Sequence, residues 1–406
     1  MPSRSTTESS YSEREQLLRA LIAAASVVAL AWVAGRVFPQ ADVRLYASYA
    51  HRMLHASLAG GLPREYPALA GIAFVLVALL PLAYLPAFMA TMATALLALV
   101  AAGERLLRRP GWSQRLLLYL ALGAAPLMLA RYDLLPALCV VIGVGLAMRG
   151  RYGGAWTAVA AGAALKLFPA LLLPGLFIEE WRRTGVAPWR RVALLACIVA
   201  GAAAIQSAVA PGTLLSPVRY EMKRGFEFSS VPGTLTLLVD PLHLTWHPGF
   251  GAWQVHGSGQ APIALMMTAA ELLLIVSVWV WLYRRRLSFE AASLAVLSVA
   301  MLTDRALAPQ YLIWVAPLWA LWPLRKSWLA ASLLSLATYP VAFVLGSTGP
   351  GSDTRDLFLA TVVGAARNVF LLAGTAAWLR SQLGATAENR VHVGEALSRS
   401  VGAPLL

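Results

Sequence analysis

Long apolar stretches separated by short polar segments dominate the pattern along the chain. Windows of apolar length predict about twelve membrane spans, near residues 17–38, 83–103, 116–130, 134–148, 154–165, 167–179, 192–210, 261–283, 287–303, 310–324, 327–346 and 357–379. An even number of crossings places both termini on one side of the membrane. The pattern therefore predicts an all-α integral membrane protein, a polytopic bundle of helices.

Composition and charge support this fold class. Of the 406 residues, 59% are hydrophobic and only 13% are charged, and the apolar segments are too many and too long for the core of one soluble domain. Most basic residues lie in short loops between the predicted spans, such as Arg284 to Arg286, and this places those loops in the cytoplasm. The net charge of +14 thus orients the protein in the bilayer. It does not indicate nucleic-acid binding, because the basic runs lack interleaved aromatic residues.

The chain divides into a membrane domain and two polar ends. Residues 1–16 and 380–406 are expected to be cytoplasmic tails, and residues 17–379 the transmembrane domain. The first span resembles a signal peptide, but its long apolar run and the spans that follow favour an uncleaved anchor. Cys139 and Cys197 both fall inside predicted spans and carry no redox or metal signal.

Two longer segments, 39–66 and 211–260, are predicted on the outer side. In the first, Asp42, Tyr46 and Tyr49 recur at helical spacing, which indicates an amphipathic helix suited to the headgroup region. The apolar run 68–80 that follows is only about 20 Å long at 1.5 Å per residue, against a bilayer core of roughly 30 Å. We expect it to be re-entrant or interfacial.

The short spans 154–165 and 167–179 are interrupted at Lys166. Pro169 follows closely, and proline removes a backbone donor and disfavours helix at the residue before it. A helical hairpin that turns back at Lys166 satisfies both the short spans and the basic loops on either side.

The ionisable residues outside the cytoplasmic loops gather in a few places. They are Asp42, Arg44, Arg64, Glu65, Arg131, Asp133, Lys166, Arg219, Lys223, Arg224, Glu227, Asp304 and Arg305. Charge at or near hydrocarbon depth is costly and is therefore a functional-site hypothesis by default. The distribution predicts a polar cavity on the outer side of the membrane.

Each candidate also has a structural interpretation. Asp42 suits either the N-cap of the helix that follows it or a general base that takes a proton from a hydroxyl. The adjacent charges Arg64 and Glu65, and likewise Arg131 and Asp133, suit local ion pairs that stabilise turns. For Glu271 and Arg367, which lie within spans, a buried ion pair between helices is the default expectation.

Lys166 has two interpretations as well. It either snorkels to the interface or binds a phosphate in a low-dielectric pocket, where Arg219, Lys223 and Arg224 could assist it. The alternative for these three is binding of anionic lipid headgroups. His51 and His55 are four residues apart, but no Glu or Cys ligand is near enough in sequence to indicate a metal.

A set of motifs occurs in a fixed order along the chain. They read Asp42-Val-Arg-Leu-Tyr46-x-x-Tyr49-Ala50, Gly60-Gly61-Leu-Pro-Arg-Glu65-Tyr66-Pro67, Arg131-Tyr132-Asp133-Leu-Leu-Pro136, Lys166-Leu-Phe-Pro169 and Pro309-Gln310-Tyr311-Leu-Ile-Trp314. From about residue 40 to 325 the chain resembles glycosyltransferase family 87. These are polyprenol-phosphate-mannose-dependent mannosyltransferase-like membrane proteins of the GT-C superfamily.

The resemblance implies a multi-pass enzyme of the bacterial plasma membrane with its active site on the extracytoplasmic side. It implies that a sugar, with mannose as the first candidate, passes from a polyprenyl-phosphate donor to a glycan or glycolipid hydroxyl. Asp42 then matches the base, and Arg131, Lys166 and Gln310 match donor-phosphate or cavity residues. The chain departs from the family at Arg224-Gly-Phe-Glu227-Phe-Ser229-Ser230, where Ser229 replaces an acid, and this bears on the acceptor and the sugar.

The working hypothesis is an inverting glycosyltransferase with Asp42 as catalytic base, with the cations rather than a metal or other cofactor stabilising the leaving phosphate. The expected partners are the lipid-linked donor, the acceptor and membrane lipids, and no nucleic acid. A transporter or flippase of a lipid-linked saccharide is the alternative, and a structural membrane subunit the third. The expected substrate-binding residues are Arg44, Tyr46, Tyr49, Glu65, Tyr66, Arg131, Asp133, Lys166, Arg224, Glu227, Gln310 and Tyr311, with Trp314 lining the cavity.

Overall fold

The computed structural model describes residues 4–37, 41–340 and 354–401, and these are mostly helical. In the first half the helices are α1 (Arg4–Val37), α2 (Ala41–His55), α3 (Leu58–Gly61), α4 (Ala68–Ala78), α5 (Tyr84–Leu107), α6 (Trp112–Gly123), α7 (Ala125–Met128), α8 (Leu134–Met148), α9 (Tyr152–Leu165), η1 (Phe168–Leu172), α10 (Leu173–Thr184) and α11 (Trp189–Val209). In the second half the elements are α12 (Ser216–Lys223), β1 (Phe226–Glu227), α13 (Val231–Val239), β2 (Thr245–Gly249), β3 (Ala252–His256), α14 (Gln260–Tyr283), α15 (Phe289–Thr303), η2 (Pro309–Tyr311), α16 (Leu312–Trp319), α17 (Lys326–Pro340) and α18 (Thr354–Val401).

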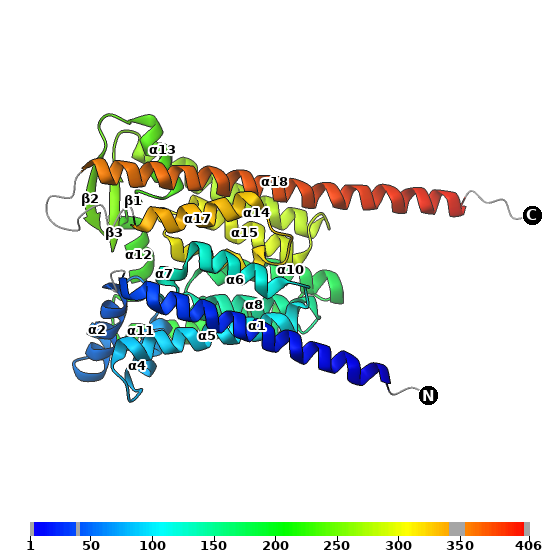
Figure 1. Ribbon diagram of the computed structural model, residues 1–406, viewed down its shortest axis with the longest axis horizontal. Helices are drawn as coiled ribbons and strands as arrows, with labels where there is room; N and C mark the ends of the chain where they lie inside the picture. Colours follow the sequence, from blue (N-terminus) through cyan, green and yellow to red (C-terminus); the bar gives the residue numbers. More distant parts are fainter. Residues whose placement is uncertain (1–3, 38–40, 341–353, 402–406) are drawn as a thin grey trace, which may run out of the picture.

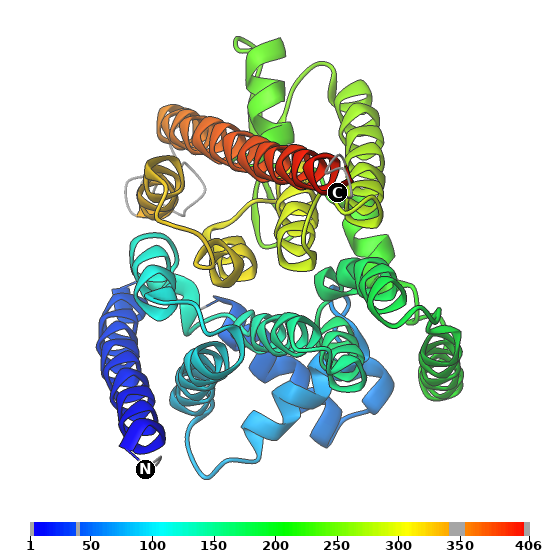
Figure 2. The ribbon, with the colours of Figure 1, turned by 90° about the vertical axis from the view of Figure 1, so that its right-hand side faces the viewer.

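Five of the described helices are long and apolar enough to cross a membrane: α1, α5, α11, α14 and α18. The apolar helix α11 buries none of its side chains against the rest of the chain and lies at the edge of the bundle (Figure 2). Lipid is the environment that explains an exposed surface of this kind. The helical class and the membrane character predicted from the sequence are thus confirmed. The twelve crossings remain a prediction, because the other predicted spans correspond to shorter helices among the described residues, and residues 341–346 of the span predicted at 327–346 lie outside them.

The two chain ends lie at the same end of the bundle, whereas α2, α12 and the strands lie at the opposite end (Figure 1). Basic loops gather with the termini: Arg108 is 3.8 Å from Glu13, and Arg149 donates to the carbonyl of Leu106 at 3.1 Å. Arg325 donates to Ser381 at 3.0 Å, which joins a further basic loop to α18. The basic loops that the sequence assigned to one side of the membrane therefore lie together at one end of the fold.

The turn predicted at Lys166 is present. Lys166 is the extended residue that ends α9, with φ −152° and ψ 138°, and Pro169 lies in the first turn of η1. Helix α10 then returns alongside α9. The reversal leaves the Lys166 side chain at the end of the bundle that carries α2 and α12.

A small antiparallel sheet is an addition to the predicted all-α architecture. Its order is β1-β3-β2, and Phe226 pairs with Val255 while Trp246 also pairs with Val255 from the other side. The β2–β3 turn places Phe250 at φ 53° and Gly251 at φ 73°. Such left-handed residues give the turn the twist of a tight hairpin.

The predicted amphipathic helix is α2, and its aromatic face is buried. Tyr46 stacks on Phe74 of α4, with ring centroids 4.4 Å apart, and meets Tyr132 edge to face at 5.6 Å. Helix α4 has 11 residues, which agrees with the short segment predicted there. The polar ends are helical where the structure describes them, since α1 begins at Arg4 and α18 continues to Val401.

Candidate functional site

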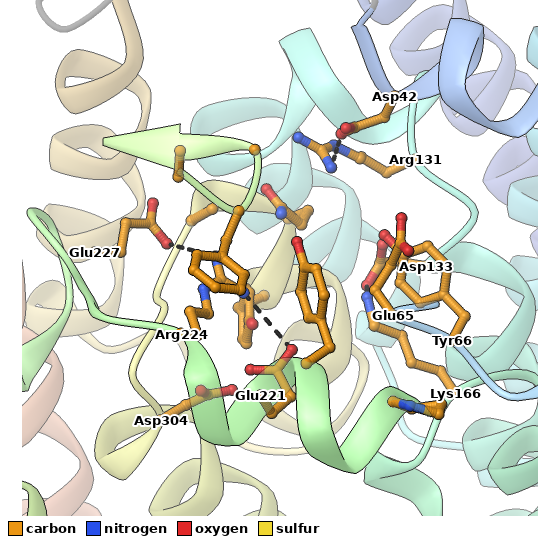
Figure 3. A pocket seen from close by; sticks show the side chains of 18 of the residues that line it. Asp42, Glu65, Tyr66, Arg131, Asp133, Lys166, Glu221, Arg224, Glu227 and Asp304 are labelled. Carbon is orange, nitrogen blue, oxygen red and sulfur yellow. Dashed lines mark hydrogen bonds and ion pairs between the residues drawn. The ribbon is translucent and has the colours of Figure 1, made fainter. Parts of the chain in front are cut away.

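A cavity of about 240 Å³ opens at the end of the bundle that carries α2 and α12 (Figure 3). Its walls come from chain segments that are far apart in sequence. Ten of the predicted catalytic and substrate-binding residues line it, namely Asp42, Glu65, Tyr66, Arg131, Asp133, Lys166, Arg224, Glu227, Gln310 and Tyr311, as does Trp314. The ordered motifs therefore meet in one place.

Asp42 and Arg131 form an ion pair at one side of the cavity (Figure 3). Asp42 is the second residue of α2 and lies inside the first turn of the helix. The N-cap interpretation required a position just before the first turn and is therefore wrong. Arg131 comes from the segment between α7 and α8. The expected local pair of Arg131 with Asp133 is wrong, because each of the two binds a residue from another segment.

Asp133 is the most buried carboxylate of the cavity, with its side chain 1% exposed. It accepts a hydrogen bond from the Lys166 ammonium at 2.7 Å and another from the Trp314 indole at 2.5 Å, both on Oδ1. The Lys166 nitrogen also lies 5.0 Å from the ring centroid of Trp314 and 5.3 Å from that of Tyr132. Lys166 is thus paired with a carboxylate and surrounded by aromatic rings at the cavity wall, and its contact with a phosphate stays a prediction.

Glu65 accepts a hydrogen bond from the Tyr49 hydroxyl at 2.7 Å. The ion pair expected between Arg64 and Glu65 is not among the ion pairs of the described residues. Three predicted binding residues lie outside the cavity: Tyr46 and Tyr49 stand behind its wall, and Arg44 is exposed. The aromatic face of α2 therefore supports the site and does not line it.

Arg224 stands between two carboxylates on the opposite side of the cavity (Figure 3). Its guanidinium is 3.7 Å from Glu221 and 3.7 Å from Glu227, and its Nε atom is buried without a partner. Glu227 is held in place because it accepts from the backbone N–H of Leu307 at 3.1 Å and from the Ser229 hydroxyl at 3.2 Å. Ser229, the departure from the family pattern, thus lies behind Glu227.

Two further acids line the cavity: Glu221, which the sequence analysis missed, and Asp304, which it noted as an ionisable residue of the predicted cavity but not as a binding residue. The three-residue spacing of Glu221, Arg224 and Glu227 was a signal that could have identified the first. Partial burial raises the pKa of Glu221, with Asp304 adding to the effect, and burial likewise raises the pKa of Asp304. Both groups therefore hold a proton to higher pH than an ordinary carboxyl.

Arg367 of α18 supports the site from behind. It donates to the carbonyl oxygen of Leu307 at 2.7 Å and to that of Ser229. The neighbouring Asn368 donates to the same Ser229 carbonyl at 3.0 Å. The expected ion pair between helices is thus wrong for Arg367, whose charge is satisfied by backbone oxygens beside Glu227.

The cavity carries more acid than base. Six carboxylates line it (Asp42, Glu65, Asp133, Glu221, Glu227 and Asp304), against the three cations Arg131, Lys166 and Arg224. The buried Oε1 of Gln310 has no hydrogen-bond partner, and neither has Nε of Arg224. Buried polar atoms are normally satisfied, so these two atoms are exceptions at the cavity wall. Such a surface suits a neutral, hydroxyl-rich molecule better than an anion.

No group of three or more His, Cys, Asp or Glu side chains within residues 4–37, 41–340 and 354–401 is arranged to hold a metal ion. In the comparisons with known proteins, no family model matches the chain and no curated protein matches it. The likeness to glycosyltransferase family 87 rests on the ordered motifs alone.

Proposed function

We propose that the protein is an inverting membrane glycosyltransferase that moves a sugar from a polyprenyl-phosphate donor to the hydroxyl of a glycan or glycolipid. The observation that carries the proposal is the convergence of the ordered motifs on one acid-rich cavity. Five separate segments contribute Asp42, Tyr66, Asp133, Lys166 and Tyr311. Segments so far apart in sequence have no local reason to bring these side chains together.

In this reaction the acceptor oxygen attacks the anomeric carbon of the sugar as the bond from that carbon to the phosphate oxygen breaks. The phosphate leaves with the electron pair, and Asp42 takes the proton of the acceptor hydroxyl. Arg131 fixes the position of the Asp42 carboxylate through their ion pair. A base that is held at a constant position contributes through orientation as well as proton transfer.

The remaining walls suit a sugar. Carboxylates accept hydrogen bonds from hydroxyl groups, and Glu65, Glu221 and Glu227 offer such oxygens from different directions. Tyr66, Tyr311 and Trp314 supply aromatic faces beside them. The family resemblance makes mannose the first candidate for the sugar. It also puts the cavity on the extracytoplasmic side of the plasma membrane, which agrees with the basic loops lying at the opposite end.

The donor phosphate needs the cation of the cavity whose existing contacts with carboxylates are the longest. Arg131 is paired with Asp42, and Lys166 with Asp133. Arg224 keeps a free buried Nε and only long contacts of 3.7 Å to its two carboxylates. Arg224 is accordingly the residue of the cavity best placed to meet the phosphate.

The test is transfer of label from a panel of synthetic polyprenyl-phosphate sugars in vesicles that contain this protein alone. Asp42→Asn keeps the size of the side chain and removes its function as a base, so transfer should fall by at least about a hundredfold. Arg44→Gln is the matched control, since Arg44 is exposed on the same helix outside the cavity. It should leave transfer at the wild-type rate.

A normal transfer rate in Asp42→Asn would remove Asp42 from the mechanism. If the wild-type protein instead moved intact lipid-linked saccharide across the vesicle membrane without transferring label, the transporter alternative would replace the enzyme.

A further inference from the structure

A second hollow, of about 560 Å³, lies at the end of the bundle that carries the basic loops, far from the acid-rich cavity (Figure 1). We call it the arginine hollow. Its walls come from α1, from the end of α5 and from the loop that leads into α6. Of the described residues, five arginines and two carboxylates line it, namely Arg14, Arg19, Arg105, Arg108 and Arg109, with Glu13 and Glu104. Its charge is therefore opposite in sign to that of the acid-rich cavity.

The backbone of the loop after α5 brings the arginines of this wall together. Arg108 follows the last residue of α5 in the left-handed conformation, with φ 49°, and Gly111 precedes α6 with φ 68°. The chain thus reverses within a few residues beside α1. Arg149 donates to the carbonyl oxygens of Arg105 and Leu106, so the end of α5 is held without the Arg105 side chain.

Two of the arginines are available for a ligand. Among the described residues, neither Arg14 nor Arg105 is within ion-pair distance of a carboxylate, and both side chains are exposed. The two acids of the wall have other contacts. Glu104 accepts from the backbone N–H of Ser113 at 3.3 Å, and Glu13 is 3.8 Å from Arg108. Two guanidinium groups from separate helices therefore line one hollow without counterions, and guanidinium suits a phosphate especially well.

The position of the hollow favours a lipid over a soluble anion. Both α1 and α5 are long and apolar enough to cross a membrane, and they pack against each other. The apolar span of α1 begins at Glu13, so Arg14 lies where the headgroups of a bilayer would lie. Leu18 and Ile22 follow Arg14 at intervals of four residues, close to one face of the helix, and are 58% and 59% exposed. Acyl chains attached to a phosphate in the hollow would contact this apolar face.

We propose that the arginine hollow binds the phosphate group of an anionic phospholipid of the cytoplasmic leaflet, between Arg14 and Arg105, with the acyl chains along α1. Basic pockets between membrane helices on the cytoplasmic side are suited to anionic headgroups. The cytoplasmic bias of basic residues explains how many arginines lie at this end, but not a hollow that two membrane helices share. The inference does not depend on the proposed function, because this lipid is not a sugar donor and its site lies at the other end of the fold.

The test is binding of labelled dioctanoyl phosphatidylglycerol to the full-length protein in micelles of a neutral detergent. Dioctanoyl phosphatidylcholine has the same chains but no net charge, and glycerol phosphate has the phosphate without chains. Both should compete much more weakly than unlabelled phosphatidylglycerol. Arg14→Gln combined with Arg105→Gln should raise the Kd for phosphatidylglycerol by at least about tenfold, because two cations near the headgroup are lost.

The matched control is Arg151→Gln combined with Arg190→Gln. It removes the same charge from two exposed positions of other basic loops outside the hollow, and it should leave the Kd unchanged. An unchanged Kd in the Arg14 and Arg105 variant would overturn the proposal. An equal rise in both double variants would also overturn it, because the attraction would then be diffuse. Equal competition by phosphatidylcholine would exclude recognition of an anion, and equal competition by glycerol phosphate would exclude a lipid.

Glu13→Gln tests the same hollow without the loss of an arginine. The side chain is exposed and has only the long contact with Arg108, so the fold should tolerate the change. Removal of this carboxylate makes the hollow more positive and releases Arg108, so the Kd for phosphatidylglycerol should fall. A Kd that does not fall would count against the site even if the double arginine variant could not be purified.

Discussion

At the scale of single residues, the cavity depends on charges paired across long stretches of chain. Asp133 lies just before α8, Lys166 just after α9 and Trp314 in α16, yet all three meet at one carboxylate oxygen. The buried Asp133 carboxylate needs a cationic partner for the fold to be stable, because an unpaired buried charge is costly. Lys166 therefore has a role in stability that its isolated position in an apolar stretch does not reveal.

Removal of the Lys166 charge should destabilise the protein. In Lys166→Met the Asp133 carboxylate, 1% exposed, keeps its charge without its partner, and a broken buried pair costs about 3–5 kcal/mol. In the double variant Asp133→Asn with Lys166→Met the charge is gone on both sides, so most of the loss should be recovered. Denaturation of the wild-type protein, the two single variants and the double variant in one detergent measures the interaction between the two side chains. Additive losses would mean that the two side chains do not interact.

At the scale of elements, close packing joins the helices of the bundle, and Trp112 is the clearest example. Trp112, the first residue of α6, is fully buried and donates from its indole to the Pro317 carbonyl at 2.8 Å. Its ring lies over Gly103 of α5, where a Cβ atom would approach it to 2.1 Å. Three elements, α5, α6 and α16, are thus joined at one aromatic side chain.

Gly103→Ala should lower the free energy of unfolding by about 1–3 kcal/mol, because the added methyl group overpacks this contact. Gly201→Ala on α11 is the matched control, since nothing lies within 4 Å of its added Cβ. The control should be unchanged or stabilised by about 0.5–1 kcal/mol, as alanine suits a helix better than glycine. Thermal unfolding of both variants in the same detergent checks the pair. Equal stability of the two would show that Trp112 moves aside without cost.

At the scale of the whole molecule, the fold separates two kinds of charged surface. The basic loops lie with the chain ends, and α2, α12 and the strands, which contribute residues to the cavity, lie at the opposite end (Figure 1). Positive loops tend to stay on the cytoplasmic side of a membrane, so we predict that the cavity faces outward.

Cysteine labelling of intact cells tests this orientation. In a background with Cys139→Ala and Cys197→Ala, Arg219→Cys on α12 should react with a membrane-impermeant thiol reagent. Arg190→Cys, in the basic loop region at the start of α11, should react only after the membrane is opened. Both positions are exposed in the fold, so a difference between them reports the side of the membrane. The reverse pattern would place the cavity in the cytoplasm and exclude a donor on the outer side.

The sequence by itself determined the features that are local along the chain. Apolar length and periodicity predicted the helical class, the amphipathic helix that begins beside Asp42, the short segment after Tyr66 and the reversal at Lys166. Helix periodicity and the effect of proline act over a few residues, so they can be read from a single segment. The cost of charge in an apolar chain marked most of the charged residues of the cavity for the same reason.

Only the tertiary structure decided how those residues are paired and which of them face the cavity. Asp42 pairs with Arg131, and Lys166 with Asp133, because separate helices bring them together; sequence neighbours suggested other partners. The tyrosines of α2 lie behind the wall, while Glu221 and Asp304 enter it. The net charge of the cavity is the sum of side chains from distant segments, and it depends on which partners those side chains already bind. Such sums are fixed by the packing of the whole chain, so no local pattern could supply them.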